Sequence, residues 1–441
     1  MKSGFLRSGL ALVLFALTGP VVFATTRTWP GAAPCNTTMQ ACIDGAANGD
    51  LIYVQSNATI DEHLNLYDRS VTIRAANGYH PALADGRSIW ITTSTLVGNI
   101  TARVSGIRLL NGFISVLYNG TGTGTYELRD MDANKITLEA DGGTVEASFY
   151  NNRLDGTPSG INDGVLQINN RGAELNAEVY FNHIRRKTNI NSDGAGIFVD
   201  ERSGSSGKMK LLGNVVHGAF NRGGIFVSEG LFSATPSSFT AYAYGNVVVC
   251  DPSASIPGSG VHFTVKDGSM TAQAVNNTVS GCNVGVTASQ WSGSGSGASI
   301  GGLVSNNLVA GANYGLSLNQ PLASSMTNDY NLINATHNTN GGFALGSHTI
   351  TAPAKLVSSG IPRLTAASPA VDAADNALLG LGLAFNNLPG LDADGLRRFK
   401  GPGSPHADIG AYEYGDMSFM HTASAPSNSH ISSIYNPITD G

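Results

Sequence analysis

The stretches LLGNVVHG (residues 211–218) and AYGNVVVC (residues 243–250) repeat one phrase, in which a small residue and an asparagine precede β-branched aliphatic residues. The two copies lie 32 residues apart. The marker asparagine recurs at steps of 30, 32, 32, 31, 30 and 24 residues, at Asn152, Asn182, Asn214, Asn246, Asn277, Asn307 and Asn331. A period of this length is typical of repeat proteins in which each coil stacks on the next.

Columns of residues around the marker differ in polarity, and this difference predicts which side chains face the core. Two positions after the marker, and three positions before it, every repeat from 152 to 307 is apolar. One and three positions after the marker, the residues are mixed or polar. Because side chains alternate between the two faces of a strand, we expect the first two columns to face inward and the other two outward. The inward columns are Leu154, Ile184, Val216, Val248, Val279, Val309 and Phe149, Val179, Leu211, Ala243, Ala274, Val304.

A second strand is predicted to begin at a glycine, at Gly196, Gly224, Gly260, Gly285 and Gly315. Short strands with no helical pattern between them predict an all-β solenoid of parallel strands. About ten coils at about 4.8 Å each give a length of about 50 Å. An asparagine suits the sharp turn of each coil because it tolerates the left-handed region, and stacked copies can hydrogen-bond as a ladder.

The first residues have the features of an export signal. Lys2 and Arg7 precede an apolar run, and Ala24 ends a small-residue cleavage site. Residues 1–24 are therefore predicted to be a signal peptide, and the mature protein to be secreted or held at the cell surface. No later stretch is apolar enough over 18 to 20 residues to predict a transmembrane helix.

Composition narrows the possible partners and predicts disulfides. With 25 basic against 31 acidic residues, and no basic run interleaved with aromatics, a nucleic-acid partner is not expected. Four cysteines in an exported chain indicate disulfides rather than a metal site. Cys35 and Cys42 are placed to staple the N-terminal cap, and Cys250 and Cys282 lie 32 residues apart, which is one repeat length. Stacked coils would bring the second pair into neighbouring register.

Both ends of the chain resemble known proteins. Residues 37–78, TTMQACIDGAANGDLIYVQSNATIDEHLNLYDRSVTIRAANG, resemble the entrance of right-handed parallel β-helix proteins of the pectin-lyase-like class. SPAVDAAD (368–375), DADGLRR (392–398) and DIGAYEY (408–414) resemble the closing region of secreted choice-of-anchor Q domain proteins. The resemblance implies a single-stranded right-handed parallel β-helix with an N-terminal cap over residues 25–345 and a C-terminal capping region over 346–415. Residues 416–441 are polar, and this composition predicts a disordered tail.

The end coils of a solenoid expose unpaired strand edges, so both ends need covers. A short helix near residues 37–47 is expected to cover the first coil. The capping region 346–415 is expected to cover the last one. Within that region we expect Arg397 or Arg398 to pair with Asp408 or Glu413, which would fold the segment over the last coil.

One outward column suggests a ligand-binding face. Phe198, Phe226 and His262 stand two residues after the opening glycine of their strands, and Asp200 follows Phe198 by two. Exposed aromatic rings in a row could stack on sugar rings along the solenoid axis. The alternative, which we favour, is that the loops at 201–210 and 229–239 fold over these rings and bury them.

A second outward column carries charges of both signs. Asp155, Arg185 and His217 share this column, and Arg186 and Lys187 follow closely. Polysaccharide lyases of this fold generally use a Lys or Arg as the base, with the uronate charge offset by other groups or by Ca²⁺. Stacked opposite charges are more often simple cross-strand pairs. The candidate catalytic residues are Arg185, Lys187, His217, Arg222, His262 and Lys266, chosen on residue type and location alone.

Two other motifs predict no chemistry. Asp392-Ala393-Asp394-Gly395 begins like a Ca²⁺ loop but has Leu396 at the fifth position, and is interpreted as a structural turn. Gly297-Ala298-Ser299-Ile300-Gly301 matches G-x-S-x-G without the strand–turn–helix context of a nucleophile elbow. No metal or cofactor is expected, apart from Ca²⁺ if the protein is a lyase.

The sequence therefore predicts a monomeric, secreted or cell-surface β-helix that binds carbohydrate or a surface protein through exposed side-chain columns. One alternative is a lyase or hydrolase acting on acidic polysaccharide. A second alternative is a structural passenger or adhesin.

Overall fold

A computed structural model describes residues 24–94, 98–157, 163–186, 194–202, 204–231, 235–251, 258–291, 297–318, 325–341, 344–379, 391–396, 398 and 406–415. The predicted signal peptide up to Phe23, the tail from Asp416, and Lys187 and Arg397 lie outside the described residues.

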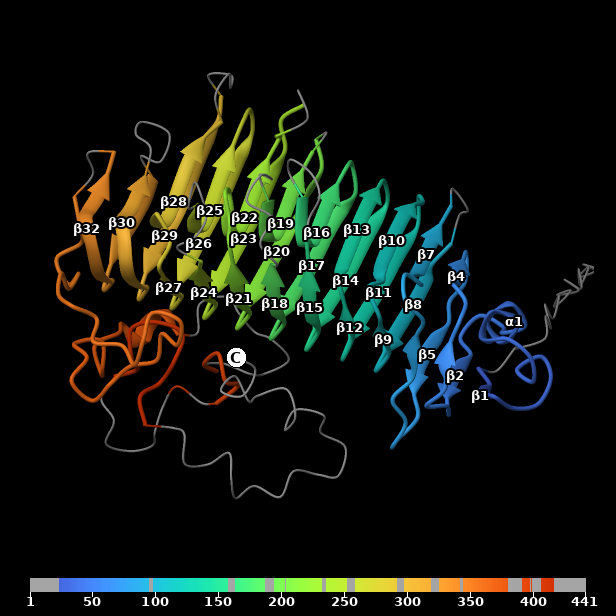
Figure 1. Cartoon of the computed structure of the whole chain (residues 1–441). Coiled ribbons are helices and arrows are strands. Elements are labelled where there is room, and N and C mark those ends of the chain that lie inside the picture. Colours follow the sequence, from blue (N-terminus) through green and yellow to red (C-terminus); the bar gives the residue numbers. More distant parts are fainter. Residues whose placement is uncertain are drawn as a thin grey trace, which may run out of the picture.

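The chain winds into a right-handed parallel β-helix with three strands in most coils (Figure 1). All pairings between strands are parallel, and each strand pairs with its counterpart one coil away. Among the described residues the first sheet has 12 strands and the second has 20, about two for each of the predicted ten or so coils. The strands of the first sheet are β1 (Thr26–Trp29), β2 (Leu51–Val54), β5 (Thr72–Ala75), β8 (Ile100–Ser105), β11 (Thr123–Arg129), β14 (Thr144–Tyr150), β17 (Glu174–Tyr180), β20 (Ser206–Leu212), β23 (Ser238–Tyr244), β26 (Ser269–Val275), β29 (Ser299–Ser305) and β31 (Ser325–Asp329).

The second sheet consists of a ladder of long strands and a ladder of short strands, which merge at β30. The long ladder contains β4 (Leu64–Tyr67), β7 (Ile89–Thr93), β10 (Phe113–Asn119), β13 (Lys135–Asp141), β16 (Asp163–Asn170), β19 (Gly194–Glu201), β22 (Gly223–Glu229), β25 (Ser259–Val265), β28 (Val284–Gln290) and β30 (Leu308–Leu318). The short ladder contains β3 (Thr59–Ile60), β6 (Ala82–Leu83), β9 (Arg108–Leu109), β12 (Asp132–Ala133), β15 (Arg153–Gly156), β18 (His183–Arg186), β21 (Val215–Gly218), β24 (Val247–Cys250), β27 (Thr278–Ser280) and β32 (Leu332–Asn340).

The predicted inward columns form the core. Every residue in the two apolar columns has 0% of its surface exposed. The register stacks each column directly, as in Ile184–Val216–Val248 and Phe149–Val179–Leu211. The glycine at each second strand has a packing role: a Cβ on Gly260 would lie 2.3 Å from Cγ1 of Val279. The core valine of the next coil therefore occupies the space that a larger residue would need.

The marker asparagines form the predicted ladder. Nδ2 of Asn214 donates to Oδ1 of Asn246 at 2.9 Å, and the backbone N–H of Asn214 donates to the same oxygen at 3.0 Å. The same pair of bonds links each marker from Asn152 to Asn331 to the next one. The left-handed residue of the turn, however, is the one before the marker, as at Asn276 (φ 56°) and Asn306 (φ 55°). The marker side chain is thereby free to turn inward and form the ladder.

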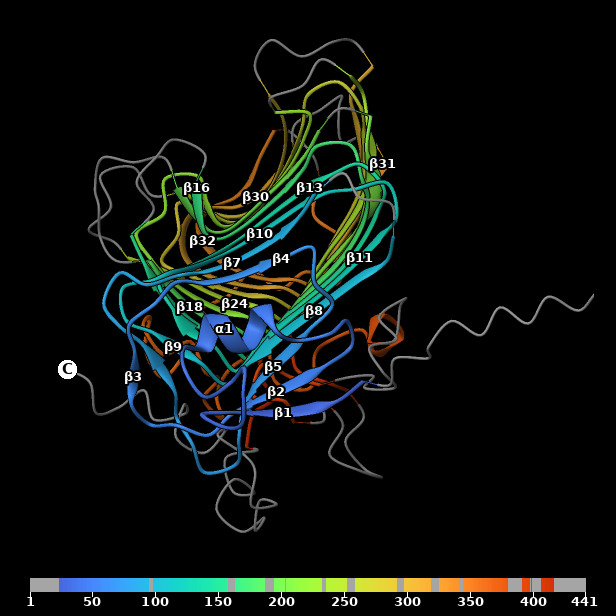
Figure 2. The ribbon, with the colours of Figure 1, turned by 90° about the vertical axis from the view of Figure 1, so that its right-hand side faces the viewer.

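The N-terminal end is covered as predicted. Helix α1 (Met39–Asp44) begins at Thr38, whose hydroxyl accepts from the N–H of Ala41 at 3.0 Å. Met39 and Ile43 are fully buried in the core, and α1 lies across the end of the coils in the axial view (Figure 2). Disulfides join Cys35 to Cys42 and Cys250 to Cys282, which confirms both predicted pairings.

The C-terminal region does not lie where the sequence analysis placed it. The described residues of this region, 350–379, 391–396, 398 and 406–415, fold back along the side of the last coils rather than over the final one (Figure 1). Ala411 and Tyr412 pack against Val247 and Val249, and Leu378 packs against Tyr244 and Val275 on the first sheet. We call the described residues between 350 and 415 the lateral clasp. The end of the last coil is instead approached by residues 344–350, in which Leu345 contacts the core and Ile350 bonds to β32.

The lateral clasp also buries outward columns that were expected to face solvent. Val247, Thr278 and Leu308 have at most 1% of their surface exposed. They point away from the core of the β-helix, but the clasp covers them: Oγ1 of Thr278 accepts from the N–H of Ala411 at 2.8 Å. The earlier members Arg153 and His183 remain outside the clasp and keep some solvent contact.

Candidate functional site

The predicted aromatic column is formed but is not available to a ligand. Phe198 and Phe226 stack with ring centroids 5.4 Å apart, and both are 0% exposed. Leu231 packs over them, and the guanidinium of Arg222 lies between the rings of Phe226 and Trp291. His262 is half-buried, and its ring centroid lies 5.0 Å from that of Phe226 in an edge-to-face arrangement. Nε2 of His262 forms a hydrogen bond with Ser289. Stacking of sugar on Phe198 and Phe226 is therefore wrong, because both rings are buried. Leu231, from the expected covering loop 229–239, forms part of the cover, and the rest comes from Arg222 and Trp291, which were not expected there.

Asp200 belongs to a buried polar corner beneath this column. Its carboxylate accepts from Ser228 at 2.7 Å and pairs with Arg202, and burial raises its pKa. Beside it, Glu229 accepts the N–H groups of Ser237 and Gly268, both at 2.9 Å. These carboxylates hold the turns that connect the second sheet to the first, so Asp200 is structural rather than a ligand-binding residue.

The candidate catalytic residues do not converge on one site. Arg185 and His217 are neighbours on the outer face of the short strands β18 and β21. Burial and the nearby Arg185 lower the pKa of His217. Arg222, His262 and Lys266 lie on or beside the long strands, and burial lowers the pKa of His262 to about 4. The candidates that lie among the described residues therefore fall into two separate groups rather than one arrangement.

Arg186, which the sequence placed near the mixed-charge column, is structural. It is 2% exposed, and Nη1 donates to the carbonyl oxygens of Gly194 and Ala219, at 3.1 Å and 2.5 Å. It therefore ties the start of β19 to the turn after β21.

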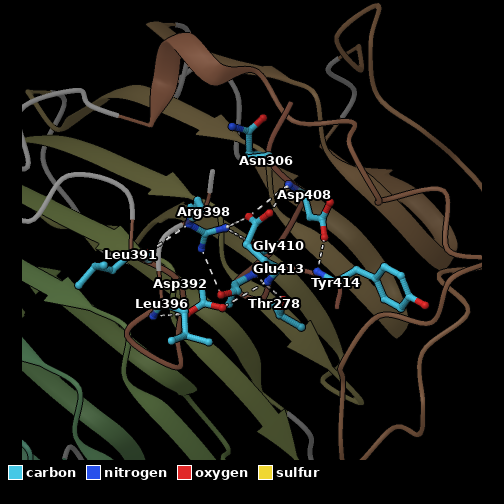
Figure 3. Close-up of polar contacts among 12 residues, drawn as sticks. Thr278, Asn306, Leu391, Asp392, Leu396, Arg398, Asp408, Gly410, Glu413 and Tyr414 are labelled. Carbon is cyan, nitrogen blue, oxygen red and sulfur yellow. Dashed lines mark hydrogen bonds and ion pairs between the residues drawn. The ribbon is translucent and has the colours of Figure 1, made fainter. Parts of the chain in front are cut away.

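The Asp392 loop is a structural turn, as expected. Oδ1 of Asp392 accepts from the N–H groups of Asp394 and Leu396, at 2.9 Å and 2.8 Å (Figure 3). Asp394 forms a bidentate pair with Arg363, at 2.6 Å and 2.7 Å. The predicted pairing of Arg398 with Glu413 is confirmed at 3.2 Å, and Arg398 is completely buried. Both carboxylates of the loop are thus used inside the lateral clasp.

An exposed aromatic surface lies on the same sheet face as Phe198 and Phe226, but several coils nearer the N-terminus. Trp90 on β7 is 40% exposed and Tyr67 on β4 is 60% exposed. The register places Asn65 beside Trp90 and Tyr67 beside Thr92, so the two rings occupy diagonal positions on adjacent coils. The rings of Phe113 on β10 and Trp90 pack edge to face, with their centroids 4.9 Å apart.

We call this surface the aromatic platform, and its outward residues share one property: all of them are uncharged. Polar groups surround the rings. The platform consists of Asn65 and Tyr67 of β4, Trp90 and Thr92 of β7, and Phe113, Ser115, Leu117 and Asn119 of β10. Leu117 is 38% exposed, so three of the large apolar side chains that the described residues expose lie on this one face. Single exposed apolar residues are ordinary, whereas a cluster marks an interaction surface.

The marker pattern does not reveal the platform, because the platform residues precede the repeats that carry the marker asparagine. The alternation of Leu64, Leu66 and then Ile89, Ile91 would have placed Tyr67 and Trp90 on the outer face. Nothing in that local pattern shows that the coils before residue 120 leave this face uncovered.

Among the described residues, no cluster of three or more His, Cys, Asp or Glu side chains could hold a metal ion. Within the same part of the chain, no helix is both long and apolar enough to cross a membrane.

No protein-family model matches the chain, and no curated protein matches its sequence. Among solved structures, the chain is similar to pectate lyase Pel9A, with 12% sequence identity and a TM-score of 0.39. The match covers 89% of this chain and 97% of the pectate lyase chain. The choice-of-anchor Q resemblance of residues 368–414 stays a prediction.

Proposed function

We propose that the protein binds an extended carbohydrate chain on the aromatic platform. The observation that carries the proposal is the exposure of Tyr67 and Trp90 on adjacent coils of one rigid sheet face. A sugar ring presents C–H groups on its faces and hydroxyls at its rim, so it suits an aromatic ring surrounded by hydrogen-bonding groups. Asn65, Thr92 and Ser115 supply such groups beside the two rings.

The geometry favours a chain rather than a single sugar. Neighbouring coils are spaced by about 4.8 Å, which is close to the length of one pyranose ring. Side chains repeat along the axis at this spacing, so successive sugars of an extended glycan could contact successive coils. Binding on a preformed sheet face also avoids the entropic cost of ordering a loop.

The platform favours a neutral glycan over an acidic one. All outward residues of β4, β7 and β10 are uncharged, so they offer no cation to offset the carboxylates of a uronate chain. A lyase acting on acidic polysaccharide would need such groups to stabilise the charge that develops next to the carboxylate. Binding without cleavage is therefore the function that the surface supports best. Export or display at the cell surface, as the N-terminal sequence predicts, would place the platform where polysaccharides occur.

The test is a Trp90→Ala variant assayed on a panel of neutral and acidic polysaccharides. Galactomannan, mixed-linkage β-glucan and hydroxyethyl cellulose would represent neutral chains, and polygalacturonate and alginate acidic ones. Loss of the Trp90 ring is expected to weaken binding of a neutral polysaccharide by about 10-fold or more, which corresponds to about 1.4 kcal/mol. Affinity electrophoresis or calorimetry measures the change.

Tyr79→Ala is the matched control, because Tyr79 is also exposed, at 36%, but lies in the turn before β6 and off the platform. The Tyr79→Ala variant should bind the neutral polysaccharide with the same affinity as the wild type. Equal binding by Trp90→Ala and wild type would contradict the proposal. The lyase alternative would instead be established if the protein released unsaturated uronates from polygalacturonate or alginate. Ultraviolet absorbance, measured with and without Ca²⁺, detects these products.

A further inference from the structure

A polar groove lies on the outer face of the first sheet, across strands β8, β11, β14, β17 and β20. Its volume is about 390 Å³, and charged and polar side chains line its floor. The register stacks these side chains in two columns. One column runs Thr125–Glu146–Asn176–Lys208, and the other runs Arg103–Glu127–Ser148–Glu178–Lys210. The groove therefore follows the axis of the β-helix, as the aromatic platform does.

The charges of the groove balance within it. Three carboxylates, at Glu127, Glu146 and Glu178, face three cations, at Arg103, Lys208 and Lys210. Arg103 pairs with Glu127 at 3.3 Å, and Lys210 pairs with Glu178 at 3.0 Å. Glu146 accepts from Nδ2 of Asn176 at 2.9 Å. The side chains that line the groove therefore sum to zero formal charge and give it no preference of their own for a polyanion or a polycation. Arg129, which is not part of the lining, also pairs with Glu127, at 3.2 Å.

The groove does, however, offer hydrogen-bond donors and acceptors close together. Ammonium, guanidinium and amide groups donate, while carboxylates accept. A hydroxyl both donates and accepts, so a ligand rich in hydroxyls can bond to both kinds of group without bringing a charge of its own. A neutral glycan is the ligand class that has this chemistry.

The groove and the platform face in opposite directions. The apolar sides of the first sheet and of the long strands share one core, so their outer faces point away from each other (Figure 2). Packed sheets lie about 10 Å apart, and the two surfaces overlap along the axis because β7 and β8, and β10 and β11, belong to the same coils. One molecule thus presents two axis-parallel surfaces on opposite sides, one aromatic and one polar.

We propose that the groove is a second binding site for a neutral glycan, so that one molecule holds two polysaccharide chains and cross-links them. This inference rests on the proposed function for its platform half, but the groove is argued from its own residues. The binding of two chains by one rigid body would join a polysaccharide network without any change of shape in the protein.

The test compares three variants with the wild type: Trp90→Ala, the double variant Glu146→Ala/Lys208→Ala, and their combination. Glu146 and Lys208 are exposed, and replacing both leaves the net charge unchanged, so the fold should be retained. Calorimetry with galactomannan oligosaccharides gives the number of sites per chain. Viscosity of a galactomannan solution measures cross-linking, and light scattering gives the oligomeric state.

The wild type is expected to bind two oligosaccharides per chain and to raise the viscosity. The groove variant and Trp90→Ala should each bind one and leave the viscosity unchanged, and the combined variant should bind none. Arg108→Ala/Asp132→Ala is the matched control, because it removes an exposed, oppositely charged pair from the outer face of the short strands. It should behave as the wild type does.

The two proposals fail in different ways. If Glu146→Ala/Lys208→Ala keeps two sites and the viscosity effect, the groove is not a glycan site, whatever Trp90→Ala does. If Trp90→Ala keeps both sites while the groove variant loses one, the platform proposal is wrong and the groove stands. If the wild type has a single site and Trp90→Ala removes it, the proposed function stands and the cross-linking proposal is overturned.

Discussion

At the scale of single residues, the marker asparagine fixes the architecture. Asn246 uses its whole side chain: Oδ1 accepts two bonds from Asn214, while Nδ2 donates to Asn277 at 2.9 Å and to the carbonyl oxygen of Leu211 at 2.8 Å. All these groups are buried, so water cannot replace a lost partner. Each coil thereby depends on the marker of the next coil.

Asn246→Ala should accordingly lower the free energy of unfolding by about 2–4 kcal/mol, since it leaves buried donors and acceptors without partners. Chemical denaturation of the wild type and the variant measures the change. Asn119→Ala, at an exposed position of β10, serves as the control and should stay within about 0.5 kcal/mol of wild type. Equal losses in the two variants would mean that the ladder does not stabilise the fold.

At the scale of strands and turns, the sequence predicted the coil interior well and its coverings poorly. Columns such as Val216–Val248–Val279 were predictable because inward residues obey a local alternation. Val247 and Thr278 lie in an outward column, and only residues more than 100 positions later bury them. The cover over Phe198 and Phe226 was predictable in part, because Leu231 comes from the loop that was expected to bury them, whereas Arg222 and Trp291 were not expected there. The platform was missed for the opposite reason, because none of the described segments covers it.

The turns from the second sheet to the first contain a carboxyl whose ionisation should affect stability. Glu201 is 0% exposed and accepts from Nδ2 of Asn170 at 2.8 Å. Burial raises its pKa from 4.5 to about 8, and Asp200 and Glu229 add to the rise. The folded protein therefore binds one more proton at this site than the unfolded chain between about pH 4.5 and pH 8. The contribution of this carboxyl to the free energy of unfolding is therefore complete below this pH range and is lost as the pH rises through it.

Glu201→Gln keeps the shape of the side chain and removes the titration. The wild type should lose stability between pH 5 and pH 8 more steeply than Glu201→Gln, as followed by the midpoint of urea unfolding across that range. Glu174→Gln, at an exposed position of β17, should reproduce the wild-type slope. Parallel curves for wild type and Glu201→Gln would show that this carboxyl does not titrate as its burial implies.

At the scale of the whole molecule, the lateral clasp joins coils that touch only their neighbours otherwise. It contacts β21 and β24 through Tyr412 and Ala411, and reaches β30 and β32 through Ile409 and Ala354. Arg398 holds the clasp together by donating to the carbonyl oxygens of Gly410 and Ala411, at 2.8 Å and 3.2 Å, besides pairing with Glu413 (Figure 3).

Arg398→Ala should destabilise the clasp by about 3–5 kcal/mol, because it leaves the carboxyl of Glu413 buried without its cation. Hydrogen exchange should then accelerate in residues 363–415, with slow exchange retained at the asparagine ladder of the early coils. Arg108→Ala, whose side chain is 63% exposed in its pair with Asp132, should change neither region. Uniform acceleration along the chain would indicate that the clasp and the coils unfold as one unit.

The position of the clasp also affects the order of events during synthesis. Coils can form one after another as the chain emerges, because each needs only the preceding one. The strip that contains Val247 and Val249 nevertheless remains exposed to solvent until Ala393, Ala411 and Tyr412 have been made. A nascent chain that stops after the coils but before the clasp would have a complete β-helix with an exposed apolar strip. Chaperones bind surfaces of this kind, and such surfaces also drive aggregation.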